Sequence, residues 1–181
     1  MLNLNETADL HYRYKMPRIE ARVESRGNGI KTAVLNLAKV SNALSRPPAY
    51  MLKYLSYELG CVSDDTNDRY IINGAHSSER IQALVYSFIK KFILCSACSN
   101  PETNIRVVGA TVKKSVANLE CTACGSKTLI DNSHKLTSYI IKNPPSDKYE
   151  QLMTNKRQGK SKKNFSHFHQ YIYDRFILFS Q

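Results

Sequence analysis

The stretch SERIQALVYSFIKKFILCSAC, residues 78–98, decides the fold, because a helical pattern in it leads directly into a pair of cysteines. Its apolar residues recur with the 3.6-residue period of an amphipathic helix and so predict one buried stripe. That stripe consists of Ile81, Leu84, Val85, Phe88, Ile89 and Phe92. Ser77 or Ser78 is the expected N-cap, since a hydroxyl there accepts a hydrogen bond from the first turn. The sequence therefore predicts a helical body joined without a linker to a cysteine motif.

Four of the five cysteines form two C-x2-C pairs, CSAC at 95–98 and CTAC at 121–124, which 22 residues separate. Two thiolates in such a turn can bind one ion at about 2.3 Å, and two turns complete a tetrahedron around zinc. The expected ligands are Cys95, Cys98, Cys121 and Cys124. A closed site of this kind has no coordination position for substrate, so its metal would stabilise the fold. Two disulfides, four free core cysteines, another soft metal and an iron–sulfur cluster remain as alternatives.

The segments around these cysteines predict a zinc ribbon. NIRVV at 104–108 and ATVKKSV at 110–116 have the composition of β-strands, and Gly125 follows the last ligand. The fifth cysteine, Cys61, follows Gly60 without a nearby histidine and is expected to be a buried structural thiol. No P-loop, nucleophile elbow, carboxylate pair or i, i+4 histidine pair is recognisable, which argues against an independent hydrolase or nucleotide-binding enzyme.

Upstream of the long helix, the sequence predicts an α+β unit with a small sheet and packed helices. Ile19, Ala21 and Val23 alternate with charged residues and indicate the first strand of a hairpin. The further expected elements are a glycine-containing turn in SRGNGIKT at 25–32, a strand at 31–35, a helix from Asn36 to RPP at 46–48, a helix from about Tyr50 to Gly60 and a strand at 68–74. The expected fold class is α+β, followed by a four-cysteine zinc ribbon.

Composition and charge indicate the kind of partner. The chain has 181 residues, of which 42% are hydrophobic, and a formal net charge of +11. It contains no apolar run of about 18 residues and no signal-peptide pattern, so we expect a cytoplasmic protein without a membrane partner. The positive field favours phosphate-rich partners, with RNA or a ribonucleoprotein first.

We expect three regions along the chain. Residues 1–92 form the α+β domain, which begins with a mobile basic arm at 1–18, and residues 93–145 form the zinc ribbon. Residues 146–181 form a basic linker and an aromatic tail, FSHFHQYIYDRFILFSQ. Docking of this tail on the body, binding to a partner and a frayed end all remain open.

The N-terminal stretch LHYRYKMPR, residues 10–18, places Arg13 between two tyrosines. A solvated basic tail would have this composition. An arm whose arginine reaches into the active site of a partner would have the same composition. The residues of the stretch alone leave both interpretations open.

The order of these features resembles the N-terminal domain of eukaryotic translation initiation factor 5. The stretches that carry the resemblance span residues 3–145, about four-fifths of the chain. They are YRYKMPR at 12–18, GNGIKT at 27–32, RPP at 46–48, KYLSYELG at 53–60, DRYIING at 68–74, FIKKFILC at 88–95, NPET at 100–103, CTACG at 121–125, HKL at 134–136 and KNPP at 142–145. The beta subunit of initiation factor 2 is similar in fold and ribbon but lacks the YRYKMPR arm.

The resemblance implies a function in translation initiation. Members of this family join the small-subunit preinitiation complex and stimulate GTP hydrolysis by the gamma subunit of initiation factor 2 on start-codon recognition. The arginine that matches Arg13 is regarded as an arginine finger, and the lysines that match Lys31 and Lys53 are implicated in the activity. The protein would thus be a GTPase-activating factor acting in trans and not itself an enzyme.

The resemblance also implies structural zinc and a set of partners. These are initiation factor 2, with its gamma subunit first and its beta subunit as a further candidate, the small ribosomal subunit, initiator tRNA and other initiation factors. For contact with tRNA phosphates the basic hairpin offers Arg18, Arg26 and Lys31 as candidates.

The chain departs from the family pattern in two places. Full-length relatives continue into a C-terminal helical-repeat domain for which 181 residues leave no room, so we expect a reduced factor or a truncated product. His11 stands where the family pattern has a phenylalanine. Two other interpretations remain: a non-activating, tRNA- or GTPase-binding structural subunit resembling initiation factor 2 beta, and a zinc-ribbon nucleic-acid module of the transcription type.

Overall fold

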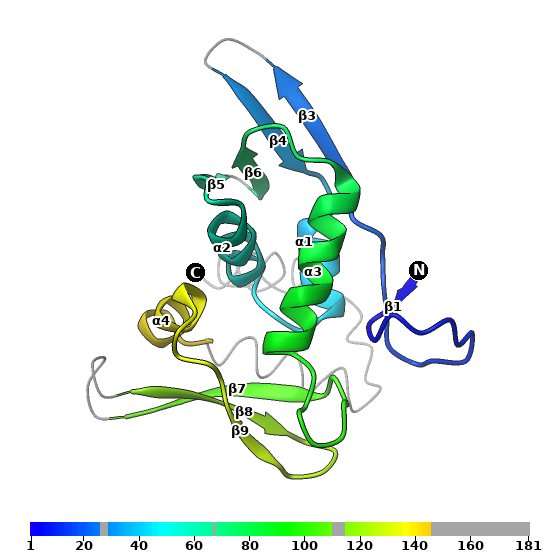
Figure 1. Ribbon diagram of the computed structural model, residues 1–181, viewed down its shortest axis with the longest axis vertical. Coiled ribbons are helices and arrows are strands. Elements are labelled where there is room, and N and C mark those ends of the chain that lie inside the picture. The colour runs from blue at the N-terminus through cyan, green and yellow to red at the C-terminus, as the bar shows by residue number, and fades with distance from the viewer. Residues whose placement is uncertain (26–28, 67, 110–114, 146–181) are drawn as a thin grey trace, which may run out of the picture.

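The computed structural model describes residues 1–25, 29–66, 68–109 and 115–145. Arg26, most of the strand expected at 110–116 and the whole of 146–181 lie outside the described residues. A four-stranded sheet lies at one end of the molecule, the helices occupy its middle, and a three-stranded ribbon lies at the other end (Figure 1). This arrangement confirms the α+β fold class.

The structure contains nine strands and four helices within the described ranges. The strands are β1 (Leu2–Asn3), β2 (Lys15–Met16), β3 (Ala21–Ser25), β4 (Ile30–Val34), β5 (Ser63–Thr66), β6 (Arg69–Asn73), β7 (Thr103–Val108), β8 (Val116–Cys121) and β9 (Lys127–Leu129). The helices are α1 (Leu37–Ala43), α2 (Pro48–Leu59), α3 (Ser78–Phe92) and α4 (Lys135–Lys142).

The larger sheet is antiparallel throughout, with the strand order β3-β4-β6-β5. β3 and β4 form the expected hairpin. β3 begins at Ala21, two residues later than expected, because the backbone N–H of Ile19 donates to Gln82 Oε1 at 2.8 Å instead of joining the ladder. The edge strand β5 was not predicted, since its sequence SDDT is polar and three of its four residues are exposed.

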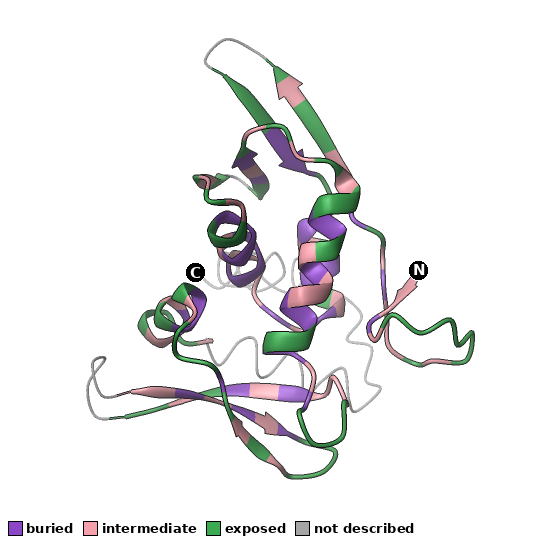
Figure 2. Cartoon of the chain, viewed as in Figure 1, coloured by how far each residue is buried: buried purple, intermediate pink, exposed green. Residues whose placement is uncertain are grey.

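The core lies between the sheet and the helices, where α3 packs along α2 (Figure 2). Five of the six residues in the predicted stripe of α3 are buried, and Leu84 is only half-buried at its edge. Ser77 is the N-cap, and its side chain accepts a hydrogen bond from the N–H of Arg80 at 3.2 Å. The long helix is therefore formed by the signals that predicted it.

The ends of the two shorter helices differ from the expectation in detail. α2 begins at Pro48, two residues earlier than expected, because a proline in the first turn has no N–H to leave unpaired. It ends as expected at Gly60, which has a φ of 65°. Asn36 precedes α1 without capping it: its side chain accepts from the N–H of Glu20 at 3.0 Å and donates to the carbonyl of Arg18 at 2.7 Å. Asn36 thus connects α1 to the segment before β3.

The ribbon is an antiparallel sheet with the strand order β7-β8-β9. The sequence did not predict α4, which follows this sheet and packs against α2, with Leu136 and Ile140 fully buried. The hydroxyl of Tyr50 in α2 donates to the carbonyl of Asn143 at 2.5 Å. Residues after the ribbon strands therefore complete the core of the helical body. Within the described ranges, the helices are all too short or too polar to cross a membrane.

Candidate metal centre and arginine surface

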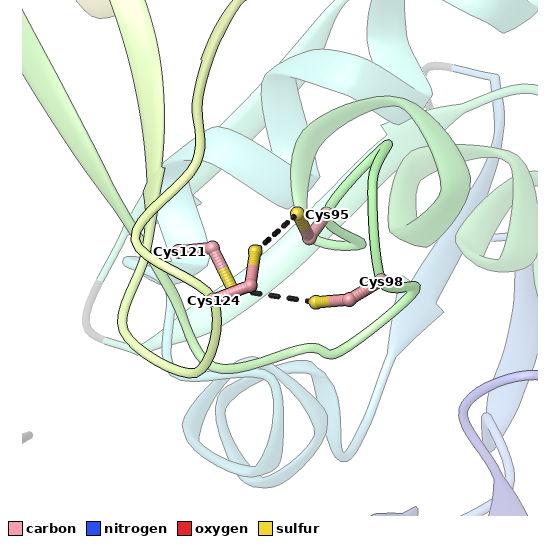
Figure 3. Close-up of side chains that lie close together, drawn as sticks. All are labelled: Cys95, Cys98, Cys121 and Cys124. Carbon is pink, nitrogen blue, oxygen red and sulfur yellow. Dashed lines mark hydrogen bonds between the residues drawn. The ribbon is translucent and has the colours of Figure 1, made fainter.

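Two loops bring the four predicted metal ligands together. Cys95 and Cys98 follow α3, whereas Cys121 ends β8 and Cys124 lies in the turn after it, and Figure 3 shows the side chains pointing toward one another. The Sγ atoms of Cys95 and Cys124 are 3.7 Å apart, and those of Cys98 and Cys121 are 3.6 Å apart. All four sulfurs lie within 4.8 Å of one another.

These spacings fit a bound metal ion better than disulfides. Four sulfurs at about 2.3 Å from a central zinc form a tetrahedron with edges of about 3.8 Å. A disulfide needs a sulfur separation of about 2.05 Å, and the five cysteines are all free thiols. The cluster can therefore hold a metal ion with four thiolates, and it leaves no coordination position open.

The electrostatics of the cluster also suit a cation. Backbone N–H groups of Cys98 and Ala97 point at the Cys95 sulfur and lower the pKa of this thiol to about 7. The N–H of Asn100 favours the thiolate of Cys98, but the neighbouring cysteine sulfurs outweigh it and raise the pKa of Cys98. Four thiolates this close repel one another, so all can be charged together only around a positive ion. The donor set fits a thiophilic dication.

A buried arginine joins the ribbon to the helical body. Arg46, in the turn between α1 and α2, is 3% exposed. Its guanidinium donates to the carbonyls of Phe92 and Thr103 at 3.1 and 2.9 Å, and to the hydroxyl of Thr103 at 2.8 Å. The sequence analysis did not single out Arg46 as a functional or structural residue. The one local feature that marks it is its position directly before Pro47 and Pro48. Arg46 fixes the end of α3 against the start of β7.

The N-terminal arm, which the sequence analysis expects to be mobile, forms a hairpin that packs on the body. β1 pairs with β2, and Leu4 and Met16 are buried in the core. The side-chain amide of Asn3 donates to the carbonyls of Thr7 and Asp9 at 2.7 and 2.6 Å and closes the loop between the strands. Apolar burial therefore anchors both strands of the arm, while the loop between them is exposed.

Arg13 lies exposed on this arm. Its guanidinium carbon is 5.7 Å from the centroid of the Tyr14 ring, within the range of a cation–π contact. Tyr12 packs edge-on against the same ring, with centroids 5.7 Å apart. Across the described ranges, Arg13 forms no ion pair with a carboxylate. Its positive charge is not neutralised within that part of the chain.

The other two expected activity residues, Lys31 and Lys53, lie on other segments than Arg13. Lys31 is exposed on β4, opposite Glu24 and Asn73, and Lys53 is half-buried on α2. The three cations lie on separate segments, with Arg13 between β1 and β2, Lys31 on β4 and Lys53 on α2.

The expected RNA-binding residues are exposed where the structure describes them. Arg18 has 65% of its side chain exposed and lies 3.6 Å from Glu79, a surface pair that contributes little to stability. Lys31 is exposed as well, and Arg26 lies outside the described residues.

His134, from the HKL stretch, holds α4 against α2. Its Nδ1 accepts from the N–H of Leu136 at 3.0 Å and caps α4, while its Nε2 donates to Glu58 Oε1 at 3.1 Å. The ring stacks on that of Tyr54, with centroids 5.2 Å apart. The hydrogen bond from His134 lowers the pKa of Glu58. His134 therefore joins α4 to α2 through two hydrogen bonds and a ring contact.

Cys61 differs from the expectation in two respects. It is half-buried, and its Sγ lies 3.9 Å from Nε2 of His76, which is 15 residues away in the sequence. That nitrogen donates to the carbonyl of Asn73 at 2.9 Å, and burial raises the pKa of the Cys61 thiol. An activated cysteine needs a lowered pKa and a base that can take its proton. Cys61 has a raised pKa, and Nε2 of His76 already donates to a carbonyl, so Cys61 is not an activated nucleophile.

Comparison with known proteins places this architecture in a family. The family described as a domain found in initiation factor 2B and initiation factor 5 matches residues 4–127, a range that contains Arg13, helices α1 to α3 and all four clustered cysteines. Eukaryotic translation initiation factor 5 of Mus musculus is 48% identical over 147 residues, which are 80% of this chain and 34% of that protein.

Two further relatives agree with this match. The factor 5 of Saccharomyces cerevisiae is 49% identical over 150 residues, covering 80% of this chain and 36% of the relative. The factor 5 of Caenorhabditis elegans is 44% identical over 162 residues, covering 88% and 36%. The chain spans about a third of the length of these curated relatives. The resemblance to initiation factor 5 is confirmed, and the chain belongs to the family that shares the domain found in initiation factors 2B and 5.

Proposed function

We propose that this chain joins the small-subunit preinitiation complex in the cytoplasm and stimulates GTP hydrolysis by the gamma subunit of initiation factor 2 on start-codon recognition. The name of its relatives, translation initiation factor 5, supports a role in initiation. The observation that carries the proposal is Arg13, an exposed guanidinium on an anchored hairpin, with no ion pair to another described residue. The protein is then an activator of a partner GTPase and not itself an enzyme.

Arginine suits this task for physical reasons. Negative charge develops on the γ-phosphate oxygens during hydrolysis, and a guanidinium keeps its own charge while its planar fork engages two oxygens. An arginine supplied in trans accelerates hydrolysis by about 10³–10⁵-fold in well-studied GTPases. Arg13 has no ion pair to a described carboxylate to break before it docks. Its transfer to a partner's phosphate therefore breaks no ion pair between described residues and costs hydration, side-chain entropy and the contact with Tyr14.

We assign zinc to the four-cysteine site as a structural ion. The thiolates of Cys95, Cys98, Cys121 and Cys124 would hold it, and it would supply positive charge that keeps the two loops together. A site closed by four protein ligands gives the metal no direct part in GTP hydrolysis. Elemental analysis of the purified protein tests the assignment, with one zinc per chain expected.

The remaining basic residues are assigned to contacts with the initiation complex. Lys31 and Lys53 support the activity from β4 and α2, two elements other than the arm that carries Arg13. Arg18, Arg26 and Lys31 contact phosphates of initiator tRNA, where their charge displaces counterions. The small ribosomal subunit and other initiation factors complete the proposed set of partners, and the beta subunit of initiation factor 2 is a further candidate.

A non-activating structural subunit resembling initiation factor 2 beta is the second candidate, because the description of the matched domain names a second initiation factor beside initiation factor 5. Such a subunit binds tRNA or the GTPase without changing the rate of hydrolysis. It has no use for an exposed arginine kept free of carboxylates. Arg13 therefore favours the activating function.

Single-turnover GTP hydrolysis on complexes of initiation factor 2, initiator tRNA and small subunits tests the proposal. We expect the wild-type protein to accelerate hydrolysis and Arg13→Ala to lose this effect while keeping its metal content and thermal melt. Arg80→Ala, which removes an exposed cation from α3, is the matched control and should stay active. A wild-type protein that binds without changing the rate would support the structural subunit, and full stimulation by Arg13→Ala would exclude the finger.

A further inference from the structure

A hydrogen bond joins the arm that carries Arg13 to the ribbon. The hydroxyl of Tyr14 donates to Oε1 of Glu102 at 2.8 Å, although 88 positions separate the two residues in the sequence. The guanidinium of Arg13 lies over the ring of the same tyrosine. The aromatic platform beneath the proposed finger is therefore fixed by a side chain of the ribbon as well as by the arm.

Glu102 is itself held by the two cysteine loops. Its N–H donates to Asn100 Oδ1 at 2.8 Å, just after the first cysteine pair. Its carbonyl accepts from the N–H and the hydroxyl of Thr122 at 3.0 and 2.9 Å, and Thr122 lies between Cys121 and Cys124. The position of Glu102 consequently depends on the loops that hold the metal ligands.

A small cavity leaves the side chain of Arg13 room to move. Its volume is about 170 Å³, and its lining includes Arg13, Tyr14 and Glu102 together with Leu44 and Ser45 near the end of α1. A side chain that borders a cavity is not wedged by packing on that side. The direction of Arg13 is then set mainly by its contact with the Tyr14 ring.

We propose that Tyr14 and Glu102 are positioning residues that aim Arg13 at the partner's phosphate and make its placement depend on the metal-loaded ribbon. This inference rests on the proposed function. Without the bond to Glu102, the ring keeps its edge contact with Tyr12 and its hydrogen-bonding interaction with the Asn100 side chain, but the carboxylate no longer sets the orientation of the ring beneath the guanidinium. Displacement of a catalytic group by about 1 Å can cost up to about 10²-fold in rate.

Kinetics on the full initiation complex separate aiming from binding. Tyr14→Phe and Glu102→Ala should each lower the saturated single-turnover rate by about 10-fold or more, with half-saturation within about 2-fold of wild type. Glu102→Gln keeps an accepting oxygen and should retain most of the rate. The double variant should lose no more than Tyr14→Phe alone, because that change already removes the hydrogen bond to Glu102. Tyr12→Phe is the matched control, since no described residue is a hydrogen-bond partner of the Tyr12 hydroxyl.

The outcomes distinguish this inference from the proposed function. If Arg13→Ala leaves stimulation intact, the proposed function fails. If Arg13→Ala abolishes stimulation while Tyr14→Phe and Glu102→Ala match wild type, the positioning role alone fails. Losses that add in the double variant would also overturn it, because they would show independent effects.

NMR of the tyrosine ring Cζ provides a readout that does not involve GTP. The resonance of Tyr14, assigned by its absence in Tyr14→Phe, should shift in Glu102→Ala as the hydroxyl loses its acceptor. Chelation of the metal should produce the same shift while circular dichroism shows that the helices persist. A Tyr14 resonance unchanged by chelation would overturn the dependence on the metal-loaded ribbon.

Discussion

Replacing Arg46 by alanine should destabilise the joint between the helical body and the ribbon. Arg46 is 3% exposed, and its guanidinium donates to the carbonyls of Phe92 and Thr103 and to the hydroxyl of Thr103. It also donates to the carbonyl of Ser45 at 3.1 Å. Truncation leaves these acceptors buried beside an empty space.

The magnitude follows from the number of bonds lost. A hydrogen bond with a charged donor contributes about 1.5–3 kcal/mol net, and four are lost, but removing a buried charge recovers several kcal/mol of desolvation. The balance is a loss of about 3 kcal/mol, a large part of the 5–15 kcal/mol typical of a folded domain. Arg46→Lys keeps the charge and loses the fork, so its loss should be smaller.

Urea unfolding at a fixed free zinc concentration measures this loss. A fixed concentration is required because metal binding contributes to the apparent stability. The midpoint of Arg46→Ala should fall while the slope with denaturant stays the same. A loss below about 1 kcal/mol would refute the reasoning, because the buried acceptors would then have found water or other partners.

Three further predictions concern a glycine, a carboxylate and a lysine. Gly60→Ala should cost about 1 kcal/mol in the same unfolding assay, because φ is 65° there and no atom lies within 4 Å of the added Cβ; an unchanged stability would contradict the backbone argument. The hydrogen bond from His134 depresses the pKa of Glu58 below its usual 4.5, so its stabilisation is present above that pH and is lost as the pH falls through the lowered value. The melting difference between wild type and Glu58→Gln should accordingly shrink below pH 4.5, and a difference that persists in acid would contradict this. Lys31→Ala should reduce the salt dependence of binding to the initiation complex by about one unit of log–log slope, whereas an unchanged slope would remove Lys31 from the phosphate contacts.

Local patterns were sufficient for the gathering of the four cysteines and for α3, whereas β8 follows the strand expected at 110–116 and β9 was not predicted. The two-residue gap in each cysteine pair fixes which sulfurs can meet, and the four sulfurs do gather. The apolar stripe of α3 is long enough for its period to be clear, and both Ser77 and Gly60 lie at the helix ends where sequence rules place them. Features that depend on residues of one element, such as ligand spacing, helical period and caps, can therefore be predicted from the sequence.

Elements that depend on contacts with residues far away in the sequence could not be predicted from local patterns. α4 has eight residues and depends on burial of Leu136 and Ile140 against α2. β5 is polar and exists because β6 provides a partner for its backbone. The contact of the arm with the ribbon was not predicted, since nothing near Tyr14 in the sequence indicates Glu102, 88 positions away. Tertiary contacts of this kind decide the structure of short or polar segments.

The most direct test of the account is the single-turnover GTP hydrolysis rate with Arg13→Lys in the full initiation complex. The variant keeps a positive charge on the same anchored arm and loses only the planar fork. The account predicts that stimulation falls to nearly that of Arg13→Ala, with unchanged binding and metal content. Stimulation equal to wild type would contradict it, because any exposed cation on the arm would then suffice.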